Sequence, residues 1–416
     1  MSTVLRDCEV RGHRVDVRID GGDIVAMDAR LEPTSTDTEV VDARGGALLP
    51  GLHDQHVHVL ALAADRVSVD CSEGLGVLTQ HRGATGWLRG VRAHESVDRH
   101  ALDLLVPDRP VRVQHRSGGL WMLNSRAVTE LADALEEGPD VERDRDGSPT
   151  GRLWRYDARL RAALQVGAPA GELDLVSIAA EMRGYGLTAV TDATPDLDDT
   201  TIELLRAFPL PTELLGDPDG VSPWKLLLRD HDLPTYVELR DAIAARRPRP
   251  VAVHCVTRES LLLTLAVLDE VGRHPEDRIE HGAVVPSPEA LRGLTVVTQP
   301  AFVTTRGDQY LRDVDSDDVP HLYRYASLLE AGVDVIASSD APYGPIDPWT
   351  VIRAAATRDL GARERVRPEV VLAGYTRGRR VAVGHPADLV LLHTDLPTAL
   401  DALDAGAVRR TWVAGR

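Results

Sequence analysis

The amino-acid sequence predicts an α/β fold, a (β/α)8 TIM-like barrel joined to a small β-sandwich domain. Short apolar, β-branched runs alternate with amphipathic helical stretches such as 235–245, 259–271 and 322–331. Eight such runs spread over roughly 300 residues are the pattern of this barrel. We expect the barrel strands around residues 52–58, 111–115, 187–192, 224–228, 251–255, 278–282, 295–299 and 333–339.

The two ends of the chain are expected to form the sandwich together. Residues 7–48 contain short alternating strands with glycine turns at Gly21-Gly22 and Gly45-Gly46, and residues 381–416 resume the same style. A barrel inserted between two β-rich ends brings both ends into one domain. The predicted domains are therefore a sandwich of residues 1–49 and 381–416 and a barrel of residues 50–380.

Two stretches inside the barrel region do not fit its strand and helix pattern. Residues 60–110 are rich in Gly, Arg and His and are expected to form a long first loop over the barrel mouth. Residues 136–152 are charged and contain Gly138-Pro139 and Asp146-Gly147, which is typical of a turn or an excursion.

Several of the predicted strands end in a side chain that can bind a metal. His56 and His58 are two residues apart, so that on a strand both imidazoles point to the same face. His254, His281 and Asp340 lie at the ends of later apolar runs. Because such barrels carry their chemistry at the carboxyl ends of the strands, these side chains are predicted to form one site. By the same spacing argument, His53 faces away from His56, and Cys255 faces away from the pocket as a small core residue.

Lys225 is the only lysine among 47 basic residues. An arginine keeps its proton, whereas a buried lysine can lose it and react as an amine, for example with carbon dioxide to form a carbamate. A carbamate is in effect a long carboxylate that can bridge two metal ions. The alternative is that this lysine is a chance survivor of compositional drift.

The order of motifs along nearly the whole chain resembles the amidohydrolase superfamily, close to its amidohydrolase-3 or YtcJ-like branch. The matching segments are Pro50-Gly51 with Asp54 and His56-x-His58, residues 110–127, residues 146–151, residues 278–281, Gln299-Pro300 and residues 339–342. At the fifth strand the chain departs from the branch, because His254 is followed by Cys-Val-Thr-Arg instead of a small Gly-Asp-Arg-Ala turn. This difference affects the expected pocket wall rather than the ligands.

The resemblance implies a role for each candidate ligand. His56 and His58 would bind one metal, His254 and His281 a second, and Lys225 would bridge the two as a carbamate. Asp340 would be both a ligand and the catalytic proton shuttle. Further candidates for substrate binding are His115, Arg116, Trp121 and Gln299. His115 ends the predicted second strand, where a substrate contact and a structural role are about equally expected.

Neutral imidazoles and anionic oxygens suit Zn²⁺ or a similar divalent ion, with one or two ions per chain and CO2 consumed as the carbamate if there are two. Such ions lower the pKa of bound water to about 7, and Asp340 would carry a proton from the attacking water to the leaving nitrogen. The expected reaction is hydrolysis of an amide-like C–N bond, other than a peptide bond, in a small molecule. The alternatives are a lactone, carbamate or cyclic imide as substrate, or a non-catalytic binding protein that retains the barrel.

Composition narrows the class of partner. The formal charge of −18 and the absence of a basic stripe argue against nucleic-acid binding. Three widely spaced cysteines imply no disulfide framework, and no apolar run approaches about 18 residues. Nothing near the N-terminus resembles a signal peptide, so we expect a cytoplasmic protein that does not cross a membrane. The sequence leaves open whether the chain forms a homo-oligomer.

Overall fold

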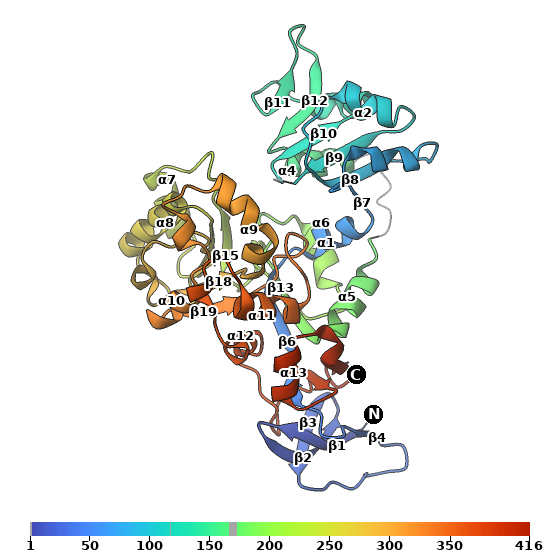
Figure 1. Cartoon of the computed structure of the whole chain (residues 1–416), viewed down its shortest axis with the longest axis vertical. Helices are drawn as coiled ribbons and strands as arrows, with labels where there is room; N and C mark the ends of the chain where they lie inside the picture. The colour runs from blue at the N-terminus through green and yellow to red at the C-terminus, as the bar shows by residue number, and fades with distance from the viewer. Residues whose placement is uncertain (1, 117, 166–172) are drawn as a thin grey trace. The chain divides into compact units, whose positions relative to one another are not determined.

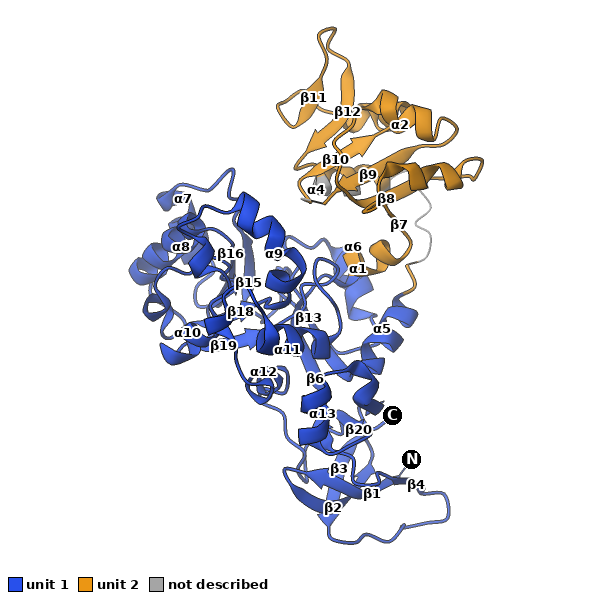
Figure 2. Ribbon diagram, viewed as in Figure 1, with its two compact units in different colours: residues 1–59, 175–416 blue, residues 60–174 orange. Residues whose placement is uncertain are grey.

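The computed structural model describes residues 2–116, 118–165 and 173–416. The chain divides into two compact units, which Figure 2 shows in different colours. The first unit combines Met1–Val59 with Leu175–Arg416, and the second is Leu60–Asp174.

The first unit contains two sets of parallel strands, several of which are labelled in Figure 1. These strands are β6 (Leu52–Val57), β13 (Leu187–Asp192), β14 (Thr212–Leu214), β15 (Trp224–Leu227), β16 (Val251–Cys255), β17 (Arg278–His281), β18 (Thr295–Thr298) and β19 (Asp334–Ala337). They pair in the orders β14-β13-β6 and β15-β16-β17-β18-β19. The Lys225 amide donates to the Leu215 carbonyl and the Asp340 amide to the His56 carbonyl, each at 2.9 Å. These two bonds join both edges of the two sets of strands and close the barrel.

Helices cover the outside of this closed ring of strands. They are α5 (Leu175–Gly184), α6 (Asp199–Arg206), α7 (Tyr236–Ala244), α8 (Arg258–Val271), α9 (Ala301–Asp313), α10 (Tyr325–Glu330), α11 (Pro348–Thr357) and α12 (Pro368–Tyr375). The sequence starts several of them with a side-chain cap. Thr235, for example, forms a capping box with Glu238 at the start of α7. Along α8, Leu261, Leu265 and Leu268 recur at helical spacing and are buried, which gives the helix an apolar face for the barrel.

One expected barrel strand belongs elsewhere. Residues 111–115 do form a strand, β9 (Val111–His115), but it lies in the six-stranded sheet of the second unit. The ring is completed by β14, which the sequence analysis missed. Strand β14 is only three residues long, reads Thr-Glu-Leu, and lacks the apolar run that marks the other barrel strands. An apolar run predicts a strand, but it does not say which sheet the strand joins.

The second unit is a folded sheet where a loop and an excursion were expected. Its strand order is β11-β12-β10-β9-β8-β7. The elements are α1 (Val59–Arg66, which begins at the last residue of the first unit), β7 (Val69–Asp70), β8 (Leu88–Ala93), α2 (Arg99–Leu105), β9, β10 (Leu120–Leu123), α3 (Ser125–Glu130), β11 (Val141–Arg143), β12 (Pro149–Trp154) and α4 (Asp157–Gln165). Leu102, Val113 and Met122 are fully buried in its core. Residues 60–110 are therefore not one long loop, because enough of their apolar side chains are buried to support a sheet.

The two chain ends form a sandwich, as the sequence predicts. One sheet has the order β3-β2-β1-β4 and the other β21-β20-β5. The strands are β1 (Thr3–Val10), β2 (His13–Asp20), β3 (Asp23–Asp28), β4 (Glu39–Asp42), β5 (Leu48–Pro50), β20 (Leu389–Leu392) and β21 (Val408–Trp412), with α13 (Leu396–Ala402) between the last two. Leu5 and Ile24 from the N-terminal sheet share one buried cluster with Leu391 and Trp412 from the C-terminal strands. The domain boundaries at residues 49 and 380 stay a prediction.

Deleting residues 387–416 is expected to prevent folding. The deletion removes β20 and β21, and it exposes apolar faces of β1, β2 and β3 together with the unpaired edge of β5. We expect insoluble protein, or soluble protein without a cooperative unfolding transition, measured by soluble yield and circular dichroism on heating. Removing only Arg416, the last residue after β21, is the control and should leave the yield nearly unchanged. A soluble, active chain that lacks 387–416 would show that the two ends do not depend on each other.

Candidate metal centre

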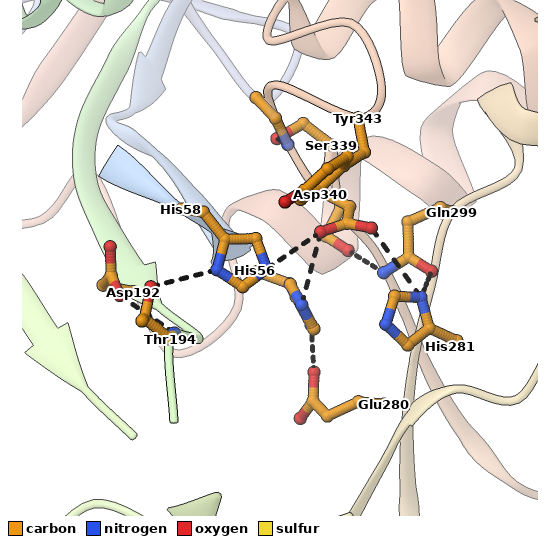
Figure 3. Close-up of polar contacts among 12 residues, drawn as sticks. His56, His58, Asp192, Thr194, Glu280, His281, Gln299, Ser339, Asp340 and Tyr343 are labelled. Carbon is orange, nitrogen blue, oxygen red and sulfur yellow. Dashed lines mark hydrogen bonds and ion pairs between the residues drawn. The ribbon is translucent and has the colours of Figure 1, made fainter. Parts of the chain in front are cut away.

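His56, His58 and Asp340 converge at the carboxyl ends of the first and last barrel strands (Figure 3). One ligand atom from each lies within 4.8 Å of the others. The Asp340 carboxylate oxygen Oδ1 is 3.2 Å from His58 Nε2 and 3.5 Å from His56 Nε2. Two ligand atoms that each lie about 2.1 Å from a tetrahedral Zn²⁺ are separated by about 3.4 Å. The spacing of the three side chains thus matches a shared metal ion.

Backbone contacts across the barrel closure hold these side chains in place. The Asp340 amide donates to the His56 carbonyl, and the His58 amide donates to the Ala341 carbonyl, each at 2.9 Å. The buried carboxylate of Asp54 accepts from the amides of His56 and Ser339, each at 3.2 Å. The loop after β19 is therefore tied to β6 on both sides of Asp340.

His281 and Asp340 both adopt the left-handed backbone conformation, with φ of 69° and 53°. A residue other than glycine pays about 1–3 kcal/mol for such a conformation, and strain of this kind clusters at functional sites. His281 is the last residue of β17 and Asp340 follows β19 by three residues, so both unusual conformations occur at the carboxyl end of a barrel strand.

His254 and His281 extend the cluster. The ring centroids of His254 and His281 are 4.4 Å apart, those of His281 and His56 are 4.9 Å apart, and those of His56 and His58 are 5.4 Å apart. His281 Nδ1 also lies 3.9 Å from Asp340 Oδ2. Four imidazoles therefore form a continuous row in which His56 and His58 contact Oδ1 of Asp340 and His281 approaches Oδ2.

The electrostatics favour the protonation states that metal binding requires. Burial is the main cause that lowers the pKa of His254 to about 3, and it also lowers the pKa of His56. Burial and the neighbouring His254 hold the pKa of His281 well below its usual value. For Asp340, burial raises the pKa, but the contacts with His58 and His56 outweigh it and the net shift is downward. These three imidazoles are neutral and the carboxylate is ionised near pH 7, as ligands must be.

Lys225 lies on β15 and interacts electrostatically with residues of this cluster. Its side chain is only 2% exposed, and within the described part of the chain its Nζ atom has no hydrogen-bond partner. Burial lowers the pKa of the amine, while Glu280 and Asp340 act in the opposite direction. A buried ammonium without hydrogen bonds is unfavourable, so the pocket favours the neutral amine.

The donor set as a whole fits a divalent ion. Among the described residues, His56 Nε2, Asp340 Oδ1 and Lys225 Nζ are all buried without a hydrogen-bond partner. An unsatisfied buried polar atom costs about 1–3 kcal/mol, and a bound cation would satisfy the nitrogen of His56 and the oxygen of Asp340 directly. Nitrogen and carboxylate ligands of this kind suit Zn²⁺ better than Mg²⁺ or Ca²⁺.

A model of the amidohydrolase family matches residues 39–416 of the chain. The chain belongs to this family. Among curated proteins, this amidohydrolase is 24% identical to the N-substituted formamide deformylase of Arthrobacter pascens, with 96% of this chain and 94% of that protein covered. It is 22% identical to the putative amidohydrolase YtcJ of Bacillus subtilis, with 88% and 87% covered.

Solved structures support the fold of this amidohydrolase. An uncharacterized metal-dependent hydrolase from Pyrococcus horikoshii has a TM-score of 0.73 at 18% identity, with 95% of this chain and 98% of that chain covered. N-isopropylammelide isopropylaminohydrolase from Burkholderia multivorans has a TM-score of 0.57 at 17% identity, with 100% and 97% covered. The predicted barrel and sandwich are thereby confirmed.

The structure of this amidohydrolase agrees with the predictions that His53 faces away from His56 and that Cys255 faces away from the pocket. The His53 ring bonds to Thr191 Oγ1 at 2.9 Å and to the Gln55 amide at 2.9 Å, away from the metal group. The Cys255 thiol lies 3.4 Å from Thr264 Oγ1 of α8, so it faces the helix layer.

Three of the four candidate substrate-binding residues lie in the second unit. His115 ends β9 and contacts the His94 carbonyl at 3.3 Å, and Arg116 follows it. Trp121 lies in a buried cluster, with the guanidinium groups of Arg89 and Arg112 each 5.5 Å from its ring. Their role in substrate binding stays a prediction.

The sequence analysis missed two residues whose side chains contact the Nδ1 atoms of the candidate histidine ligands. His58 Nδ1 lies 3.0 Å from Thr194 Oγ1, and His56 Nδ1 is hydrogen bonded to Glu280 (Figure 3). Glu280 had a visible signal, since it sits between Arg278 and His281 in one of the family motifs. Thr194 had none, because a threonine after a strand is common.

Among the described residues, no helix is both long enough and apolar enough to cross a membrane.

Proposed function

We propose that this amidohydrolase is a metal-dependent hydrolase that cleaves an amide-like C–N bond in a small molecule. The observation that carries the proposal is the group formed by His56, His58 and Asp340, whose ligand atoms lie within 4.8 Å of one another at the end of the barrel. A bound Zn²⁺ would polarise the scissile carbonyl and make a water molecule acidic enough to attack it near pH 7.

In this proposal, His56, His58 and Asp340 hold one ion, and His254 and His281 hold a second. The ring centroids of His254, His281 and His56 are 4.4 and 4.9 Å apart along this series, so two ions held by the two groups would be neighbours. Lys225 would bridge them after its neutral amine forms an N–C bond to CO2 and releases a proton. The buried, unpartnered Nζ atom and its lowered pKa support that reaction, since only the neutral amine is a nucleophile.

Asp340 would act as base and then as acid. Its carboxylate, ionised at neutral pH, accepts a proton from the attacking water and later donates it to the leaving nitrogen. One of its two oxygens can contact the metal ion while the other accepts the proton. Oδ1 faces His56 and His58, while Oδ2 lies on the side of His281.

The amide assignment draws on the relatives. The curated relative from Arthrobacter pascens is named as a deformylase of N-substituted formamides, and such substrates contain an amide C–N bond. We therefore propose N-acyl or N-formyl amines as the first substrates to test, ahead of lactones, carbamates and cyclic imides.

Metal removal should abolish hydrolysis. The purified chain is treated with a chelator, dialysed, and assayed on a panel with one substrate from each of these four classes, before and after addition of Zn²⁺. We expect activity on the amide to vanish and to return with Zn²⁺ but not with Mg²⁺, because imidazole-rich sites bind Mg²⁺ weakly. A metal-free chain that keeps its activity would refute the metal-dependent mechanism. Faster turnover of the lactone or imide than of any amide would refute the substrate class alone.

A further inference from the structure

We propose that Glu280 and Gln299 are positioning residues that select which nitrogen of His56 and His281 faces the metal. This inference rests on the proposed function and adds to it a pair of residues that decide the tautomers of two ligands. Each of the two residues presents an acceptor to Nδ1 of one imidazole. Nδ1 must then carry the proton, and Nε2 is left as the ligand atom.

The first arrangement is a buried chain from Arg278 through Glu280 to His56. Glu280 is fully buried, and its carboxylate, which can only accept while ionised, is hydrogen bonded to His56 Nδ1 (Figure 3). The Arg278 guanidinium donates to both carboxylate oxygens of Glu280 and also to the Gln55 carbonyl at 2.7 Å. Because Arg278 and Glu280 are two apart on β17, both side chains are on one face of the strand. The carboxylate is thus held from one side while it orients His56 on the other.

The second arrangement uses an amide instead of a carboxylate. Gln299 is fully buried, and its Nε2 donates to Ser338 Oγ at 2.9 Å. The Ser338 hydroxyl in turn lies 3.4 Å from the Thr298 carbonyl, to which it donates. The Gln299 oxygen is therefore turned toward His281, whose Nδ1 is 2.8 Å away. An amide oxygen only accepts, so His281 must donate from Nδ1.

The Nδ1 partner of His58 does not fix the tautomer in this way. Its Nδ1 partner is the Thr194 hydroxyl, which can donate as well as accept. Thr194 alone does not decide a tautomer, and this difference makes Glu280 and Gln299 the two informative positions.

The test measures metal affinity. Metal-free wild type, Glu280→Gln and Gln299→Leu are titrated with Zn²⁺ against a chromophoric chelator, and the Co²⁺ absorption spectrum of each is recorded. In Glu280→Gln, Arg278 should claim the single remaining oxygen and turn the amide NH2 toward His56, which reverses the tautomer. In Gln299→Leu, the proton acceptor of His281 is lost. We expect each variant to bind Zn²⁺ about 10–100-fold more weakly and to show an altered Co²⁺ spectrum.

Two matched variants separate positioning from general damage. Glu364→Gln changes another buried glutamate, which pairs with Arg324 and accepts from Ser327, and it should leave affinity and spectrum unchanged. Gln299→Glu keeps an acceptor toward His281 and should restore the affinity that Gln299→Leu loses. If Glu280→Gln does not fold, the two variants at position 299 carry the test.

The possible failures are distinct. Wild type that binds metal, with Gln299→Leu binding it equally tightly and with the same Co²⁺ spectrum, would overturn the positioning assignment and leave the proposed function standing. Wild type that binds no metal at all would overturn the proposed function, and the assignment with it.

Discussion

Replacing Lys225 with arginine is expected to remove most of the bound metal and to lower activity by about 10²-fold or more. Losing a residue that hydrogen bonds to a metal ligand lowers metal affinity or activity by about 10–100-fold, and losing a ligand itself should have a larger effect. The guanidinium has no amine that reacts with CO2, and it keeps its positive charge in a pocket that must hold cations. The measurement is metal content by elemental analysis, together with turnover. Bicarbonate should speed the reloading of metal-depleted wild type and have no effect on the variant.

Two further substitutions at this position give the controls. Lys225→Met removes the charge, so metal should remain if Lys225→Arg fails only through repulsion, and should be lost if the bridge is what matters. Lys225→Glu should recover part of the metal, because a shorter carboxylate has the right charge. Full metal content and full activity in Lys225→Arg would make the single lysine an accident of composition, and the proposal of two bridged ions would fail.

Changing Asp340 to asparagine is expected to lower turnover by about 10²–10⁴-fold, the range for loss of a general acid–base group. The amide keeps one oxygen that can still contact the ion but has no carboxylate to accept the proton. Turnover should therefore fall further than metal content. Both are measured on the same preparation, so that the rate can be expressed per bound metal.

Asp347 provides the matched control. It lies in the same loop as Asp340, where its carboxylate caps α11 by accepting from the amides of Trp349 and Thr350. Asparagine is also a good cap, so Asp347→Asn should keep nearly full activity. An Asp340→Asn variant as active as this control would remove Asp340 from the proton-transfer role.

Much of the barrel could be predicted because its strands are buried on both faces. Continuous apolar runs mark β6, β13 and β15 to β19 within a residue or two of their observed bounds. The failures have the same origin. Strand β14 is too short and too polar to form a run, and β9 has the composition of a barrel strand but pairs within the second unit.

The candidate ligands were predictable because their signals are local. The two-residue spacing of His56 and His58 and the position of His281 at the end of a run can be read from the sequence. The contact between His56 and Glu280 joins residues 224 positions apart, and no local pattern predicts such a pairing. The residues that hydrogen bond to the ligands could therefore be identified only from the structure.

The closure of the ring has a consequence for how the protein folds. The hydrogen bonds from the Asp340 amide to His56 and from the His58 amide to Ala341 join segments that enter the barrel last and first. The contacts at this seam therefore have a very high contact order and are expected to form late. His56, His58 and Asp340 all belong to this seam, and a chain whose ring is still open has no complete site. An ion that binds only the closed ring adds to its stability by mass action, about 4 kcal/mol when free metal is at 1,000 times its dissociation constant. Metal binding and barrel closure would in this way be thermodynamically linked, so the seam is expected to be less stable in a chain without metal.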